Sequence, residues 1–254
     1  MVDRSDVLRE LGLLPVWRLR TRPAEIAPPP VLRDAAVDPV RTAPASGAAD
    51  RIARIATLGW PDFAADVQAC TACGLCRSRR QAVPGVGDAN AEWMFIGEAP
   101  GAEEDARGEP FVGQAGRLLD NMLAALGMRR ETNVYIANVL KCRPPGNRTP
   151  EPGEVDACRP YLDRQIALIR PKLIVALGRS AATTLLAVDA TIASLRGRVH
   201  RYQGVPLIVT YHPAYLLRNL PDKAKAWEDL CLARATIRAL HDADGLQSAA
   251  AAPK

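Results

Sequence analysis

Four of the six cysteines in the chain form two pairs that could hold a metal. Cys70 and Cys73 are separated by two residues, and Cys142 and Cys158 lie fifteen residues apart further along the chain. Four thiolates from two regions suffice for a tetrahedral zinc ion or for a cubane iron-sulfur cluster. Zinc ribbons prefer two closely spaced pairs, so the wide second gap favours iron-sulfur while zinc stays open.

The other two cysteines are interpreted differently. Cys76 follows Cys73 by three positions and resembles part of a ferredoxin run, but the run lacks its continuation, and we interpret Cys76 as a spare thiol. Cys231 lies between two leucines in an amphipathic stretch, and we interpret it as a small core residue. Disulfides do not persist in a reducing compartment, so the clustered cysteines indicate metal or redox chemistry.

Three further side chains could do chemistry, and each stands at or just after the end of a short apolar stretch. Glu98 could position or deprotonate a water molecule, Asn138 offers both a donor and an acceptor, and His212 could donate to a leaving group. Each has a plainer alternative: a helix-dipole partner for Glu98, a turn former for Asn138 and a structural histidine for His212.

The elements that must position these residues alternate along the chain. Apolar stretches that predict buried strands cover residues 93–97, 134–139, 173–178 and 205–210, and helical stretches cover residues 116–126, 151–169, 180–186 and 223–240. This alternation predicts an α/β fold with a parallel sheet covered on both faces. Ligands bind outside the carboxyl ends of such strands, so we expect Glu98, Asn138 and His212 to converge at one edge of the sheet.

Composition bounds the rest. The 254 residues, 48% of them hydrophobic and 5% aromatic, predict one core with an extension. We expect residues 1–60 to be a Pro/Ala-rich extension that is largely disordered or docks on a partner, residues 61–241 to form the domain, and residues 242–254 to be a disordered tail. The net charge of +5 favours a polyanionic partner. With no membrane-spanning apolar run and no signal peptide, we expect a cytoplasmic protein without a membrane partner.

Five motifs in order resemble the family 4 uracil-DNA glycosylases, over roughly residues 66–240. They are CTAC, GEAPGAEED, EPFVG, NVLKCRPPGNRTP and HPAYLLR, which begin at Cys70, Gly97, Glu109, Asn138 and His212. The resemblance implies a three-layer α/β/α sandwich around a mainly parallel four-stranded sheet. It also implies a 4Fe-4S cluster on Cys70, Cys73, Cys142 and Cys158, which leaves Cys76 outside the ligand set.

The activity implied is release of uracil from a flipped-out nucleotide in DNA, which leaves an abasic site for base excision repair. Phe111 would stack on the base, Asn138 would read the uracil edge, and His212 would stabilise the departing ring. Glu98 would direct water and stabilise the sugar cation. The expected substrate-binding set is Gly97, Glu98, Ala99, Gly101, Glu104, Phe111, Asn138 and His212, with Glu104 crowding the base's C5 position to exclude thymine.

Two segments are expected to contact DNA. Tyr215, Leu216, Leu217 and Arg218 would form a wedge that fills the gap left by the base, with Arg218 on a phosphate and no basis for separating the two leucines. The loop from Arg143 to Arg148 offers a further phosphate-contacting surface, although Lys141, Arg143 and Arg148 could equally be ordinary exposed bases. The alternative for the wedge is a core patch at a helix start.

Other functions remain open at this point. The chain could be a lesion sensor without turnover, or a protein that traps uracil-DNA covalently, although no basic, histidine-bearing insertion lies between Asn138 and Cys158. A repair or replication partner could bind through residues 1–60. We expect a monomer that acts on single- or double-stranded DNA.

Overall fold

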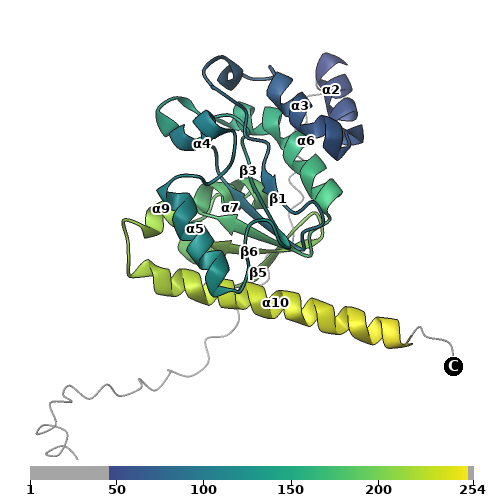
Figure 1. Cartoon of the computed structure of the whole chain (residues 1–254), viewed down its shortest axis with the longest axis vertical. Coiled ribbons are helices and arrows are strands. Elements are labelled where there is room, and N and C mark those ends of the chain that lie inside the picture. Colours follow the sequence, from purple (N-terminus) through teal and green to yellow (C-terminus); the bar gives the residue numbers. More distant parts are fainter. Residues whose placement is uncertain (1–45, 251–254) are drawn as a thin grey trace, which may run out of the picture. The chain divides into compact units, whose positions relative to one another are not determined.

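The computed structural model describes residues 46–250, all within one compact unit. Residues 1–45 of the expected extension lie outside the described residues, as do residues 251–254. From residue 46 onward the chain folds around a single sheet, with helices on both of its faces (Figure 1).

The sheet has six strands in the order β1-β3-β2-β4-β6-β5. The four central strands are parallel and match the predicted ones: β3 (Val134–Asn138), β2 (Trp93–Gly97), β4 (Leu173–Leu177) and β6 (Val205–Thr210). Two antiparallel edge strands, β1 (Val86–Gly87) and β5 (Val199–Tyr202), were not predicted, so the expected count of four is corrected to six. Neither strand has a hydrophobic pattern that would predict it from the sequence, because β1 has only two residues and β5 is mostly exposed.

Alternating side chains of the strands build two core layers, which makes the fold a three-layer α/β/α sandwich. On one face, Met94 and Ile96 of β2 pack with residues of α6 (Pro152–Ile169) and α7 (Arg179–Leu186). On the other face, Trp93 and Phe95 pack with residues of α5 (Gln114–Ala125) and α10 (Asp222–Ala250). Burial of alternate residues on opposite faces is what an α/β sheet with two helical layers requires.

A third core region joins the N-terminal helices to the cysteines. Ile55 of α2 (Ser46–Thr57) and Phe63 of α3 (Trp60–Ala69) pack with Leu140, Cys142 and Tyr161. The last part of the expected extension is therefore a largely exposed helix that packs against the domain through Ile55. The remaining short elements are η1 (Gly74–Arg77), α4 (Ala102–Arg107), η2 (Pro145–Asn147), α8 (Ile192–Leu195) and α9 (Pro213–Leu216).

Helix α10 is the longest element and lies against the face of the sheet that α5 also covers. It runs to Ala250, so the expected domain boundary at residue 241 falls inside a helix. Among the described helices, none is both long and apolar enough to cross a membrane.

Candidate active site and cysteine pocket

A cleft of about 480 Å³ opens at the carboxyl edge of the parallel strands. It collects side chains from the ends of β2, β3 and β6 and from the loops that follow them. Ten of the predicted site residues line it, namely Glu98, Ala99, Gly101, Glu104, Phe111, Asn138, Arg148, His212, Tyr215 and Arg218. Pro100, Ala115, Pro144, Asn147 and Ala214 line it as well, without having been singled out from the sequence.

Asn138 of β3 lines the cleft, whereas Gly97, its partner in β2, was predicted to bind substrate but lies outside the lining. Asn138 is 2% exposed, and its Oδ1 atom has no hydrogen-bond partner within the described protein. A Cβ atom on Gly97 would lie 2.6 Å from the ring of Phe111 and would also collide with Asn138 Oδ1. Glycine is therefore needed at position 97. A buried acceptor without a partner is rare in folded proteins and indicates a place for a ligand donor.

His212 lines the same cleft and is fixed by its own helix cap. As the residue before α9, it accepts a hydrogen bond at Nδ1 from the backbone N–H of Ala214, at 3.1 Å. Burial and, to a smaller extent, the charge of Arg218 together lower the pKa of His212 to about 4, although Glu104 acts in the opposite direction. The ring is therefore neutral at pH 7. Because Nδ1 is an acceptor, the proton of the neutral ring resides on Nε2, which is free to donate.

The ring of Phe111 faces His212, with 5.5 Å between the ring centroids and 30° between their planes. Phe111 also belongs to the core layer that contains Phe95. The residue thus serves both as part of the core and as one wall of the cleft.

Glu98 follows β2 and is held beside Asn138 by a continuation of the strand pairing. The backbone N–H of Leu140 donates to the Glu98 carbonyl at 3.0 Å. Burial raises the pKa of the Glu98 carboxyl, and a hydrogen bond with Ser180 opposes this rise. Ser180 lies in the first turn of α7, which follows β4, and nothing in the sequence marked it as a partner of Glu98.

Glu104 reaches the cleft from α4, but its carboxylate is committed to the backbone. It accepts hydrogen bonds from the N–H groups of Gly101 at 3.1 Å, Val112 at 2.9 Å and Gly113 at 3.2 Å. These bonds tie the loop after β2 to the loop that carries Phe111. The exclusion of thymine by Glu104 remains a prediction.

The structure separates the two leucines of the expected wedge. Leu216 is 1% exposed and packs with Tyr211 and Ala226, whereas Leu217 is 39% exposed. Tyr215 stacks on Tyr211, with their centroids 5.2 Å apart. Leu217 is therefore the side chain of the pair that faces outward, and Leu216 anchors the turn beneath it.

The basic residues divide in a similar way. Arg148 lines the cleft but forms a two-pronged ion pair with Glu154, at 2.9 and 2.6 Å. Arg143 lies outside the cleft lining and donates to Asn147 Oδ1 at 2.7 Å.

For Lys141, the alternative of an ordinary exposed base is wrong. The residue is 1% exposed, and its Nζ donates to the Asn138 carbonyl at 2.8 Å and to Gln165. Burial lowers the pKa of Lys141 to about 8. Its place in the interior makes it a support for the end of β3 instead of a DNA contact.

The cysteines gather at a second, smaller pocket. Cys70, Cys73, Cys76, Cys142 and Cys158 all line it, whereas Cys231 lies in α10. In the part of the chain that the structure describes, no three His, Cys, Asp or Glu side chains are grouped as ligands of one metal ion. The exclusion of Cys76 from the ligand set remains a prediction, since this residue shares the pocket.

Nitrogen donors surround the cysteine sulfurs. The guanidinium of Arg79 donates to Cys142 Sγ at 2.9 Å, and the backbone N–H of Lys141 donates to Cys158 Sγ at 3.2 Å. Arg51 lies 3.5 Å from Cys70 Sγ. Hydrogen bonds and positive charge of this kind stabilise thiolate ligands, so the donor set fits an iron-sulfur cluster.

Comparison with known proteins agrees with this geometry. The model of the uracil-DNA glycosylase superfamily matches residues 84–231. A type-4 uracil-DNA glycosylase of Archaeoglobus fulgidus is 48% identical over 164 residues, which cover 61% of this chain and 82% of that protein. One of Thermotoga maritima is 44% identical over 176 residues, covering 68% and 91%. A type-5 uracil-DNA glycosylase of Thermus thermophilus is 34% identical over 160 residues, covering 50% and 73%.

Proposed function

The chain belongs to the type-4 branch of the uracil-DNA glycosylase superfamily, and from this premise we propose that its cleft releases uracil from DNA through Glu98, Asn138 and His212. It is a DNA glycosylase, a hydrolase of the N-glycosidic bond. The observation that carries the proposal is the buried Asn138 Oδ1 atom, which has no hydrogen-bond partner within the described protein and belongs to a residue that lines the same cleft as the neutral imidazole of His212.

Asn138 selects the base. Its Oδ1 accepts from uracil N3–H, and its Nδ2 donates to uracil O4. Cytosine presents the opposite pattern at these two positions, so its binding would leave buried polar groups unpaired, which a site of this kind rejects strongly. Phe111 supplies the ring on which the extruded base stacks, and the missing side chain of Gly97 lets this ring and Asn138 lie close together.

His212 acts on the leaving group. When the glycosidic bond breaks, negative charge develops on uracil O2, and the Nε2–H of the neutral ring donates a hydrogen bond to it. The bond from Ala214 N–H to Nδ1 fixes this tautomer before substrate arrives, so no reorganisation is needed during the reaction.

Glu98 acts on the sugar side. Its carboxylate accepts the proton of the attacking water, and its negative charge stabilises the cation that forms on the deoxyribose. The raised pKa makes Glu98 a better proton acceptor than an exposed carboxylate, while Ser180 holds the side chain in place. The products are free uracil and an abasic site.

A 4Fe-4S cluster on Cys70, Cys73, Cys142 and Cys158 would stabilise the part of the cleft that contains Asn138. When bound, it supplies a cross-link between the N-terminal helices and the loop that follows Asn138. Only Val139, Leu140 and Lys141 separate Asn138 from Cys142 along the chain, so this cross-link fixes the end of β3. Its role in this proposal is structural.

DNA is held at the rim of the cleft. Leu217 enters the space vacated by the base, and Arg218 contacts the phosphate backbone. The rigid turn beneath them comes from Leu216 and from the stacked pair of Tyr215 and Tyr211.

Incubation of the whole protein with a uracil-containing oligonucleotide tests the function. We expect free uracil and an alkali-labile abasic site, with no release from the same oligonucleotide carrying thymine. Binding without free base would show a lesion sensor instead. A protein–DNA adduct that survives denaturing electrophoresis would show a covalent trap.

A further inference from the structure

The backbone of Phe111 is held in an unfavourable conformation. Its φ angle is 56°, in the left-handed region that bulky residues avoid. Such conformations persist only where the surroundings impose them. The orientation of the ring toward His212 therefore depends on whatever restrains the segment from Pro110 to Gly113.

Arg130 supplies the restraint from one side. One terminal nitrogen donates to the Pro110 carbonyl at 2.9 Å, and the other donates to the Phe111 carbonyl at 2.5 Å. The latter nitrogen also lies 3.4 Å from the Gly116 carbonyl, and Nε binds Asp120 at 2.5 Å. The planar guanidinium can bridge two adjacent carbonyls in a way that the single ammonium of lysine cannot.

Glu104 supplies the restraint from the other side, through its bonds to the N–H groups of Val112 and Gly113. The Glu104 carboxylate and the Arg130 guanidinium thus hold the backbone of four consecutive residues, Pro110 to Gly113. The segment also rests directly on the first turn of α5, because a Cβ atom on Gly116 would collide with the Phe111 carbonyl. Movement of Phe111 is blocked on three sides.

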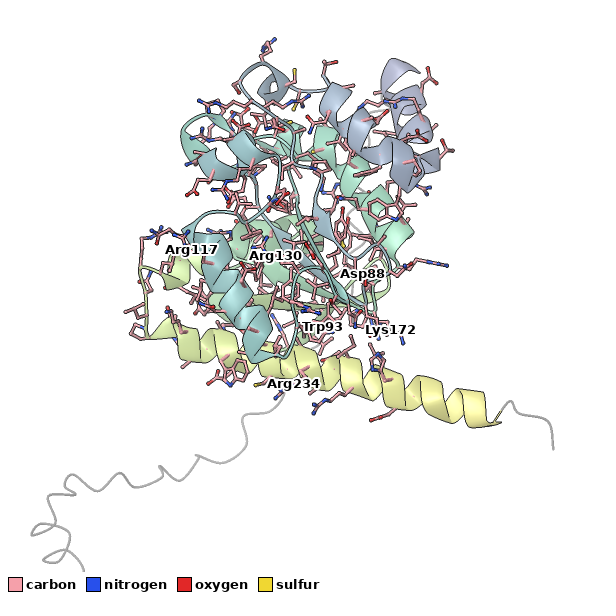
Figure 2. All side chains as sticks on the ribbon, in the orientation of Figure 1. Asp88, Trp93, Arg117, Arg130, Lys172 and Arg234 are labelled. Carbon is pink, nitrogen blue, oxygen red and sulfur yellow. The ribbon has the colours of Figure 1, made fainter. Side chains whose placement is uncertain are left out.

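Arg130 lies outside the cleft lining and comes from the turn between α5 and β3 (Figure 2). Its side chain is 20% exposed, so the bonds to the backbone are only partly open to water. We propose that Arg130 is a positioning residue, which fixes the backbone of Phe111 so that the ring is already in place to stack on the extruded base. The inference rests on the stacking role of Phe111 in the proposed function.

A double-mutant cycle tests the coupling. If Arg130 acts through Phe111, then Arg130→Met and Phe111→Ala each slow single-turnover uracil release by about tenfold, within the range of a base–aromatic stack. The double variant is then no slower than Phe111→Ala alone. Arg129→Gln is the matched control, because Arg129 is an exposed neighbour in the same turn and bonds only locally to Thr132.

Fluorine NMR gives a readout that does not depend on activity. The chain has three phenylalanines, so uniform fluorophenylalanine labelling gives three resonances, and Phe111→Ala assigns one of them. In Arg130→Met the Phe111 resonance shifts or broadens, while those of Phe63 and Phe95 keep their positions and report an intact fold. Arg129→Gln leaves all three unchanged. If Arg130→Met does not fold, Arg130→Lys carries the test, with a smaller change in the same resonance.

The outcomes separate the inference from the function. Native-like release by Arg130→Met, an unmoved Phe111 resonance, or rate losses that multiply in the double variant would each overturn the positioning role. Native release by Phe111→Ala would instead refute the stacking role in the proposed function, and the inference with it.

Discussion

The neutral state of His212 has a consequence for stability that can be worked out from its pKa. Burial, with Arg218 adding to it, lowers the folded-state pKa from 6.5 to about 4. Between these values the unfolded chain binds a proton that the folded chain does not, so stability is lost as pH falls from about 6.5 to 4. This difference in pKa lowers the free energy of unfolding by roughly 3 kcal/mol below pH 4, and about 2 kcal/mol of that loss has already occurred at pH 5.

The perturbation that isolates this contribution is His212→Asn. Asparagine still accepts the hydrogen bond from Ala214 N–H as a helix cap, but it has no proton to gain. Urea unfolding of both proteins at pH 8 and pH 5 is the assay. Because other groups titrate equally in the two proteins, we expect the free energy of unfolding of the native protein to fall by about 2 kcal/mol more than that of the variant between pH 8 and pH 5.

Equal losses in the two proteins would refute the reasoning. So would a folded-state titration of the His212 ring near its ordinary pKa, observed by NMR. For activity, the neutral-donor role predicts that single-turnover release does not follow an ionisation of His212 near 6.5, because the ring stays neutral down to about 4. A rate that rises as the imidazole becomes protonated near 6.5 would contradict that role.

Three further predictions concern other parts of the molecule. Leu217→Ala slows uracil release from duplex DNA with little change in thermal stability. Leu216→Ala instead lowers the free energy of unfolding by about 2–5 kcal/mol, because removal of the buried side chain opens a cavity. The reverse pattern in unfolding and duplex assays would contradict this assignment. Lys141→Met leaves the Asn138 carbonyl without its donor, so we expect the free energy of unfolding in urea to fall by about 1–3 kcal/mol and discrimination between uracil and cytosine to weaken. Unchanged discrimination would show that Lys141 does not contribute to base selection. Iron and sulfide analysis after anaerobic purification finds the cluster lost in Cys142→Ala and kept in Cys76→Ala, and stoichiometric zinc in native protein would refute the cluster.

The sequence predicts best where the signal is local. The four parallel strands are continuous apolar runs, and the placement of Glu98, Asn138 and His212 at one edge follows from strand polarity alone. The edge strand β1 could not be predicted, because two residues that include a glycine at φ 133° give no periodicity.

The supporting contacts were beyond prediction for a different reason. Lys141 reads as an exposed charge, and only the fold reveals that the Asn138 carbonyl and Gln165 compensate its burial. Arg130 carries no motif, and its partners at Pro110 and Phe111 lie about twenty residues earlier in the chain. Interactions that depend on the three-dimensional path of a loop leave no pattern in sequence spacing.

The most direct test of the central claim is the ratio of uracil release to cytosine release in native protein and in Asn138→Asp, under single-turnover conditions on matched oligonucleotides. A carboxylate at this position repels uracil O4 and accepts from the amino group of cytosine. We predict that uracil release falls by about 100-fold or more and that the ratio shifts toward cytosine. An unchanged ratio would contradict the claim that the buried amide of Asn138 selects the base.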